Sequence, residues 1–268
     1  MRELKPVYEE SLKELLELLR WFSHFGQMPI IIGGWGVHVY NSYCGSIDVD
    51  VIGESFGGKF LEVVERYERT HDYEFYPKDP LGIETMTRKP IVRNGRVFGH
   101  IEIDACTVED PRPSRFHEDE TKKLPYSLCL RKKYRREVNF SKGASCYVPS
   151  KPLLFLYKLK AVRDRTHDLR TGAGIMAPEK EEFLHSKLLK DMSDLLALLD
   201  PSPKVLLLKE EMDLRVLRDL TKRHHLEFAL QSVRELPKMR DAISFYNPTL
   251  SRKSVEEWVN SSLRSLAA

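Results

Sequence analysis

The chain has 268 residues, of which 41% are hydrophobic, 31% charged and 10% aromatic. This length suffices for one large domain or two ordinary ones, and the composition excludes collagen-like and intrinsically disordered proteins. Lys and Arg exceed Asp and Glu by only three, 43 against 40, so any nucleic-acid-binding surface must be a local cluster of cations.

Cysteine usage and hydropathy indicate a cytoplasmic protein without a membrane anchor. The four cysteines include no C-x-x-C pair, which favours reduced thiols. The first twenty residues alternate charges and lack the apolar core of a signal peptide. Residues 21–47 carry no Asp, Glu, Lys or Arg, but glycines, a proline and two histidines interrupt them, so we expect no transmembrane helix.

The first half of the chain alternates helices and strands. Apolar residues at helical spacing predict a helix over 6–25. The run Ile30–Ile32 followed by Gly33-Gly34 predicts a strand, a tight turn and a short helix. Period-two and helical patterns then predict the following elements: a strand over 47–51, a helix over 59–70, and strands over 90–93 and 97–107 joined by a turn at Asn94-Gly95.

After about residue 150 the pattern becomes helical. Helices are expected over 153–165, 183–199, 203–225, 226–236 and 254–266. The sequence therefore predicts an N-terminal unit of strands and helices followed by a helical C-terminal unit, with Pro149 and Pro152 near the boundary.

Two aspartates in the second predicted strand are the first candidate functional residues. Asp48 and Asp50 alternate with apolar residues in 47–51, so a strand places both carboxylates on one face with Cα atoms about 7 Å apart. Such a pair of like charges is stabilised either by a bound cation or by exposure to water, and both interpretations are open at this point. Asp104, with His100 and Glu102 on the same predicted face, adds an acid on another strand.

Three carboxylates on adjacent strands suit divalent cations that act on a phosphate group. Mg²⁺, or Mn²⁺ in its place, prefers oxygen ligands, and no Cys/His spacing favours zinc. Upstream, Gly33-Gly34 allows the backbone N–H groups to approach a phosphate. These patterns together indicate phosphoryl or nucleotidyl transfer.

At this point the residues resemble a known family. Ile32-Gly33-Gly34, a spacer of thirteen residues, Asp48-Val49-Asp50-Val51 and a later Ile103-Asp104-Ala105 resemble the signature of the DNA polymerase β-like nucleotidyltransferase superfamily. Tyr157–Arg165 and Lys190–Leu195 are similar to two motifs of AbiEii-type nucleotidyltransferase toxins. The resemblance spans about residues 28–200 and implies an α+β fold. Residues 1–150 would form a nucleotidyltransferase domain with a mixed sheet and flanking helices, and residues 151–268 an all-helical domain that completes the nucleotide and acceptor site.

The resemblance also implies roles for individual residues. Asp48, Asp50 and Asp104 would be catalytic and bind the metal ions, with Glu102 an alternative or additional ligand to Asp104. The residues implied in nucleotide binding are Gly33, Gly34, Ser46, Lys158, Arg165, Asp191 and Asp194. One departure from the family pattern lies at Cys44, where an Arg is common two residues before the Ser that precedes D-x-D.

Two other nucleotide-binding motifs compete with this assignment. Residues 53–59 fit the G-x-x-x-x-G-K pattern of a P-loop, but Phe60 stands where Ser or Thr would bind Mg²⁺. Gly34-Trp35-Gly36 lacks the third glycine of a dinucleotide-binding fingerprint. Both are less probable on these grounds than the nucleotidyltransferase signature.

A basic segment over 112–142 is a candidate contact with RNA. Residues 111–143 carry ten cations against four acids, and Tyr134 within Arg131–Arg136 could stack on a base. The sequence thus predicts a Mg²⁺-dependent enzyme that transfers NMP from an NTP to an acceptor hydroxyl. An AbiEii-like acceptor would be a tRNA 3′ end, with an antitoxin as protein partner. A small-molecule acceptor and a catalytically idle RNA- or protein-binding module remain alternatives.

Overall fold

The computed structural model describes residues 5–76, 86–205 and 207–267. The chain divides into two compact units, each formed from separate stretches of sequence. The sheet unit contains the residues up to Gly36, Gly45–Asp110 and Tyr126–Pro149. The helical unit contains Val37–Cys44, Pro111–Pro125 and the residues from Ser150 onward. The two inserted stretches, 37–44 and 111–125, have no counterpart in the single boundary expected near residue 150.

The sheet unit is built on a five-stranded mixed sheet in the order β6-β2-β1-β10-β9. Its strands are β1 (Ile30–Ile31), β2 (Val49–Gly53), β6 (Ile103–Thr107), β9 (Arg135–Ser141) and β10 (Ala144–Pro149). β2 runs parallel to β6 and β1 parallel to β10, whereas the β1–β2 and β9–β10 pairs are antiparallel. The α+β class with a mixed sheet is thereby confirmed. The strands β9 and β10 were not predicted.

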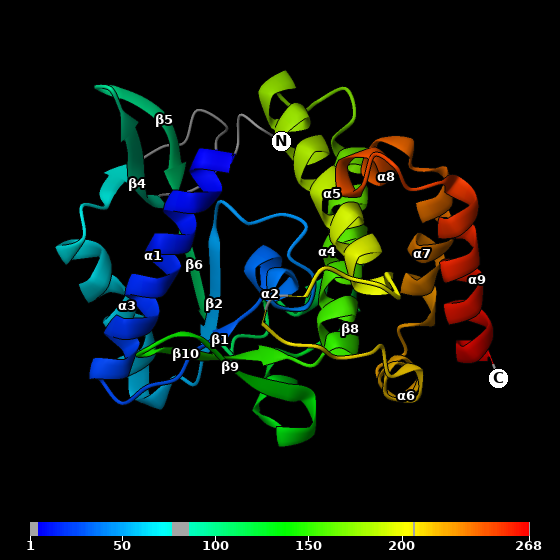
Figure 1. Cartoon of the computed structure of the whole chain (residues 1–268), viewed down its shortest axis with the longest axis horizontal. Helices are drawn as coiled ribbons and strands as arrows, with labels where there is room; N and C mark the ends of the chain where they lie inside the picture. Colours follow the sequence, from blue (N-terminus) through cyan, green and yellow to red (C-terminus); the bar gives the residue numbers. More distant parts are fainter. Residues whose placement is uncertain (1–4, 77–85, 206, 268) are drawn as a thin grey trace. The chain divides into compact units, whose positions relative to one another are not determined.

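Helices α1 (Lys5–His24) and α3 (Lys59–Thr70) pack on this sheet (Figure 1), α1 against β10 and α3 against β6. Both match the helices predicted over 6–25 and 59–70, because each presents an apolar stripe to the core. The rings of Phe22 and Phe60 stack between the two helices with centroids 5.4 Å apart. The short helix α2 (Gly33–Tyr40) begins directly after β1, as expected.

A second, three-stranded sheet in the order β3-β4-β5 belongs to the same unit. It consists of β3 (Glu74–Tyr76), β4 (Met86–Arg93) and β5 (Arg96–Ile101). Asn94 and Gly95 connect β4 and β5 with φ values of 51° and 72°, which confirms the predicted hairpin turn. The single strand predicted over 97–107 is wrong. The chain leaves one sheet at Glu102, so β5 pairs with β4 whereas β6 pairs with β2.

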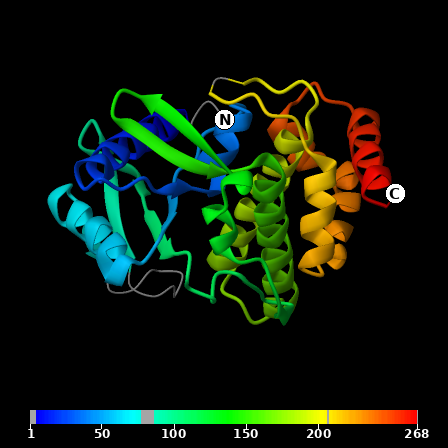
Figure 2. The same ribbon diagram turned by 90° about the horizontal axis from the view of Figure 1, so that it is seen from below.

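The helical unit is centred on two 22-residue helices, α4 (Lys151–Gly172) and α5 (Pro178–Leu199), which lie side by side in both views (Figures 1 and 2). The other helices and strands of this unit are α6 (Leu214–Arg223), α7 (Gln231–Glu235), α8 (Arg240–Tyr246), α9 (Arg252–Ala267), β7 (Arg115–Phe116) and β8 (Asp119–Lys123). None of the helices in the described ranges combines the length and apolar character needed to cross a membrane.

Three helix predictions in this unit need correction. The helix expected over 203–225 begins only at Leu214, where the Asp213 side chain accepts N–H groups of the first turn. Residues 226–236 form a 3-10 turn, Glu227–Leu230, followed by the short helix α7 and not one continuous helix. Helix α8 was not expected.

Candidate functional site

Asp50 and Asp104 lie opposite each other on adjacent parallel strands. In the β2–β6 ladder, Asp50 pairs with Asp104, Val49 with Ile103 and Val51 with Ala105. Paired residues of neighbouring strands point to the same face at a strand spacing of about 4.8 Å. We call Asp50 and Asp104 the acidic pair. Two motifs more than fifty residues apart in the chain therefore meet as the family signature implies.

The glycine motif touches the acidic pair. Gly33 has a φ of +61°, and a Cβ atom added there would lie only 1.7 Å from Oδ2 of Asp50. The neighbouring Ile32 N–H donates a 3.1 Å hydrogen bond to the Asp50 carbonyl oxygen. Since Gly33 is also the first residue of α2, the start of that helix, with its partial positive charge, faces the Asp50 carboxylate. Gly34 follows in the same first turn.

Asp48 and Ser46 lie in the segment between α2 and β2. The predicted strand over 47–51 is wrong at its start, because residues 47 and 48 form a bend and β2 begins at Val49. The argument that Asp48 and Asp50 share a strand face therefore does not apply. Asp48 remains half-buried and two residues from Asp50, and Ser46 is half-buried as well. Their roles stay predictions.

Glu102 and Asp104 differ in their surroundings. An Oε1 atom of Glu102 lies 2.5 Å from Nε of Arg88, and both side chains are largely buried. Glu102 thus holds the start of β4 near the junction of β5 and β6. Asp104 is exposed and stands in register with Asp50. The geometry favours Asp104 over Glu102 as the partner of Asp50.

Tyr126 and Cys106 lie near the acidic pair. Burial raises the pKa of the Cys106 thiol to about 12, with further contributions from Asp104, Asp110 and Asp50. Burial also raises the pKa of Tyr126, and the charges of Asp50 and Asp104 act in the same direction. Tyr126 therefore keeps its hydroxyl proton beside the pair at any physiological pH. The sequence gave no sign of this residue, which sits in a 3-10 turn (Tyr126–Leu130) far along the chain.

A divalent cation at this place would draw on few protein ligands. Across the described residues, no three or more His, Cys, Asp or Glu side chains are grouped so as to hold a metal ion. The acidic pair offers carboxylate oxygens from two adjacent strands, which suits Mg²⁺, since this ion commonly takes one or two carboxylates and completes its shell with water and substrate phosphates. The donor chemistry of the pair thus fits Mg²⁺ or Mn²⁺.

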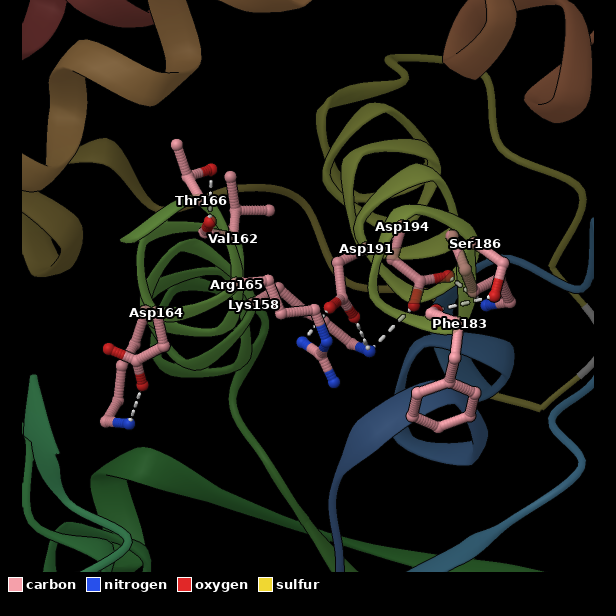
Figure 3. A network of polar contacts seen from close by, with 11 residues as sticks. Lys158, Val162, Asp164, Arg165, Thr166, Phe183, Ser186, Asp191 and Asp194 are labelled. Carbon is pink, nitrogen blue, oxygen red and sulfur yellow. Dashed lines mark hydrogen bonds and ion pairs between the residues drawn. The ribbon is translucent and has the colours of Figure 1, made fainter. Parts of the chain in front are cut away.

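Four of the predicted nucleotide-binding residues meet in the helical unit (Figure 3). Nζ of Lys158 on α4 lies 2.9 Å from Oδ1 of Asp191 and 2.7 Å from Oδ2 of Asp194, both on α5. Arg165 also pairs with Asp191. Lys190 lies 2.5 Å from Asp194. We call these five side chains the ion-pair cluster.

The ion-pair cluster is buried and carries a net charge of +1, from three cations and two acids. Side-chain exposure is 9% for Lys158, 0% for Asp194 and 28% for Arg165. Burial alone would raise the pKa of Asp191, but Arg165 and Lys158 outweigh it and hold the pKa below its usual value. The Tyr43 hydroxyl donates to Asp194 at 2.6 Å. Of the two predicted nucleotide-binding cations, Arg165 is the more accessible.

The basic segment over 112–142 is divided between the two units. Residues 112–125 belong to the helical unit and residues 126–142 to the sheet unit. Tyr134 is only 2% exposed, so the hypothesis that it stacks on a base is wrong. In the helical unit, part of this segment borders a cavity of about 550 Å³ lined by Glu118, Asp119, Lys122, Arg163, His225, Glu227 and Phe228. Acids and bases are mixed there, and Arg163 pairs with Glu118.

The loop that fits the P-loop pattern already holds an anionic group of the chain itself. The Ser55 N–H donates to both carboxylate oxygens of Glu109, at 3.1 and 3.3 Å. A P-loop offers such N–H groups to phosphates. This contact gives residues 53–59 a structural role at the start of α3.

Comparisons with known proteins give one distant likeness. No family model matches the chain, and no curated protein is similar to it. Among solved structures, the chain is similar to one described as the crystal structure of an antigenic nucleotidyltransferase-like protein from Paracoccidioides brasiliensis. The sequence identity is 14%, the match covers 87% of this chain and 91% of that chain, and the TM-score is 0.40. A likeness at this level is too distant to establish a shared fold.

Proposed function

We propose that the chain is a nucleotidyltransferase, which transfers NMP from an NTP to the hydroxyl group of an acceptor. The observation that carries this proposal is the meeting of Gly33, Asp50 and Asp104: a glycine at a helix start against one carboxylate, with a second carboxylate in register on the next strand. Each feature alone is common. Together they match the chemistry of a site that holds phosphates beside divalent cations.

In this proposal Asp50 and Asp104 hold Mg²⁺, with Asp48 as a further ligand. When bound, the cation neutralises charge on the phosphates and stabilises the leaving pyrophosphate. The backbone N–H groups at Gly33-Gly34 bind the triphosphate. An Oδ atom of the exposed Asp104 accepts the proton of the acceptor hydroxyl. The hydroxyl oxygen then bonds to the α-phosphorus as the bond to the bridging oxygen of pyrophosphate breaks.

The acceptor in this proposal is RNA, with a tRNA 3′ end as the specific hypothesis and an antitoxin as the protein partner. The support is the similarity of Tyr157–Arg165 and Lys190–Leu195 to AbiEii-type motifs, together with the way these motif residues pair on α4 and α5. Arg165, partly exposed and next to a cluster of net positive charge, would bind an anionic group of the nucleotide.

The test is to incubate the full chain with Mg²⁺, total RNA and each of the four NTPs labelled at the α-phosphate. We expect label in RNA from at least one NTP, and a loss of about 10³-fold or more in Asp50→Asn and in Asp104→Asn, since electrostatic stabilisation supplies most of the rate in such reactions. Glu65→Gln on the exposed side of α3 removes a charge of the same sign and serves as the matched control.

Other outcomes would contradict parts of the proposal. Label confined to small products favours a small-molecule acceptor. No transfer at all, with NTP binding that calorimetry finds equal in the wild type and in the Asp50→Asn, Asp104→Asn double variant, identifies an idle module.

A further inference from the structure

The three-stranded sheet has one side that faces away from α1. On the opposite side, Lys89 of β4 reaches the buried Glu14 of α1 at 2.7 Å, and Ile101, which pairs with Lys89, is 3% exposed. Side chains alternate along each strand, and paired residues share a side. By this register, Tyr76, Phe98 and His100 lie together on the side away from α1. We call these three residues the aromatic face.

The aromatic face presents ring surface to solvent. Phe98 is 62% exposed. The rings of Tyr76 and His100 meet edge to face with centroids 5.6 Å apart, and the Tyr76 hydroxyl lies 3.4 Å from Nε2 of His100. Phe98 and His100 are two residues apart on β5, so their rings stand about 6.6 Å apart along the strand. Exposed rings in a row of this kind offer a platform for stacking.

The hairpin that carries Phe98 and His100 is strongly basic. Residues 86–101 contain four cations, Arg88, Lys89, Arg93 and Arg96, and no acid. Arg96 is exposed and lies on the same side as Phe98 by the alternation along β5. Arg88 is on this side as well, beside Glu102. The charge of the hairpin therefore complements a phosphate backbone.

The same stretch of chain leads to the acidic pair. β5 ends at Ile101, a single residue follows, and β6 begins at Ile103 with Asp104 next. Six residues separate Phe98 from Asp104, so the two lie at most about 20 Å apart along the extended chain. An acceptor stacked on Phe98 would have its end within a few nucleotides of Asp104.

We propose that the aromatic face binds the single-stranded end of the RNA acceptor by stacking its bases on Phe98 and His100, while Arg96 contacts the phosphates. This inference rests on the proposed function for its choice of acceptor. Single-stranded nucleic acid fits the combination of rings and cations, because every base has a face that stacks on an aromatic ring. A protein partner or a second copy of the chain would use the rings but gain nothing from the cations.

The test measures RNA binding in the absence of catalysis. The probe is a fluorescein-labelled, single-stranded oligoadenylate of twelve nucleotides, titrated with the full chain in EDTA and followed by fluorescence anisotropy. We expect Phe98→Ala to weaken binding by about five-fold or more and Phe98→Trp to preserve it, since base–aromatic stacking is sequence-tolerant and depends on the ring. Arg96→Ala should weaken binding and reduce its dependence on salt concentration.

Phe75 provides the matched control. It is 64% exposed on β3 of the same sheet, but its pairing with Thr87 places it on the α1 side. Phe75→Ala should therefore bind the probe like the wild type. Equal losses in Phe75→Ala and Phe98→Ala, or no loss in either, would overturn the proposal. A loss of self-association in Phe98→Ala, seen by light scattering with RNA binding unchanged, would overturn it in favour of a contact between two copies.

The outcome is separable from that of the proposed function. Because Asp50→Asn and Asp104→Asn leave the aromatic face unaltered, both variants should bind the probe normally. Phe98-dependent binding without any nucleotidyl transfer would leave the RNA contact standing and contradict the enzyme. Transfer to RNA that is indifferent to Phe98→Ala would do the reverse.

Discussion

Gly33 meets two separate requirements at one backbone position. Its φ of +61° is a left-handed conformation, which disfavours residues with a side chain by roughly 1–2 kcal/mol. The space where a Cβ would stand is filled by the Asp50 carboxylate. The first requirement concerns stability, and the second concerns the position of a proposed metal ligand.

Gly33→Ala and Gly26→Ala separate these two effects. Gly26 has a similar φ of +64°, but a Cβ there would meet no atom within 4 Å. We expect both variants to lose about 1–2 kcal/mol of unfolding free energy in urea, because both place alanine in the left-handed region. Only Gly33→Ala should also weaken Mg²⁺ binding measured by calorimetry, by ten-fold or more, since Asp50 must move. Equal Mg²⁺ affinities in the two variants would contradict the close contact between Gly33 and Asp50.

Single residues of the candidate site were predictable where a motif fixes their spacing. Gly33, Asp50 and Asp104 fall on a strand end, a strand and a neighbouring strand, and the structure brings them together. Tyr126 was not predictable, because its approach to the pair depends on how a distant 3-10 turn packs. Tyr134 was misjudged, because an aromatic residue inside a charged run can be buried by its surroundings.

Among the elements, helix α1 is tied to the three-stranded sheet through one buried carboxylate. Glu14 is 3% exposed, and its Oε1 atom accepts hydrogen bonds from the hydroxyls of Tyr67 at 2.7 Å and Tyr73 at 3.1 Å. Its Oε2 atom pairs with Lys89 of β4. A buried carboxylate is stabilised by such donors and a counter-ion, and removal of its charge leaves Lys89 unpaired.

Glu14→Gln should lower the unfolding free energy by about 1–3 kcal/mol, the range for a buried group that loses a charged partner. Chemical denaturation followed by circular dichroism measures the loss. Glu17→Gln is the control, because Glu17 lies on the exposed side of the same helix, where a substitution changes stability by about 0.5 kcal/mol or less. A Glu14→Gln variant as stable as Glu17→Gln would show that the contact with Lys89 contributes nothing.

The elements themselves were predictable where one periodicity dominates. The stripes of α1 and α3 are unmistakable at helical spacing. Strand β10 alternates buried Ala144, Cys146 and Val148, but its partner β9 lies in a run of cations, and the hairpin was read as a charged surface. The stretch 97–107 reads as one strand, because local alternation does not reveal that two sheets divide it at Glu102.

On the scale of the whole molecule, each unit gathers stretches that are distant in the sequence. The helical unit takes in 37–44 and 111–125 besides the residues from Ser150 onward. Within it, Asn41 donates to the Ala197 carbonyl oxygen at 3.0 Å and Tyr157 to that of Pro125 at 3.1 Å. Such long-range contacts leave no local pattern, so a sequence boundary near residue 150 describes only the largest of these stretches.

Because the ion-pair cluster belongs wholly to the helical unit, Asp191→Asn should act there first. Near neutral pH the variant leaves Lys158 and Arg165 short of a counter-charge, and we expect a loss of about 3–5 kcal/mol. Hydrogen exchange should rise more in α4 and α5 than in β1, β2 and β10. Glu181→Gln, on an exposed part of α5, is the control. A uniform rise over both units would contradict this expectation.

The same variant tests the pH dependence of stability. The pKa of Asp191 is lowered in the folded chain, so its contribution is present above the unfolded value of about 3.9 and is lost as the pH falls further. The wild type should therefore lose unfolding free energy below about pH 4 more steeply than Asp191→Asn. Parallel curves for the two proteins would show that Asp191 titrates normally.

The alignment of β2 with β6 has a consequence for chain-length changes near the site. A slip of one residue between these strands would place Ile103 or Ala105 opposite Asp50 and turn Asp104 to the other face, because side chains alternate along a strand. The bond from Val49 N–H to the Glu102 carbonyl oxygen, 2.9 Å long, helps to prevent such a slip. Insertion or deletion of one amino acid between Ile101 and Asp104 should thus abolish any activity that needs both carboxylates, even though every side chain named in the site is still encoded.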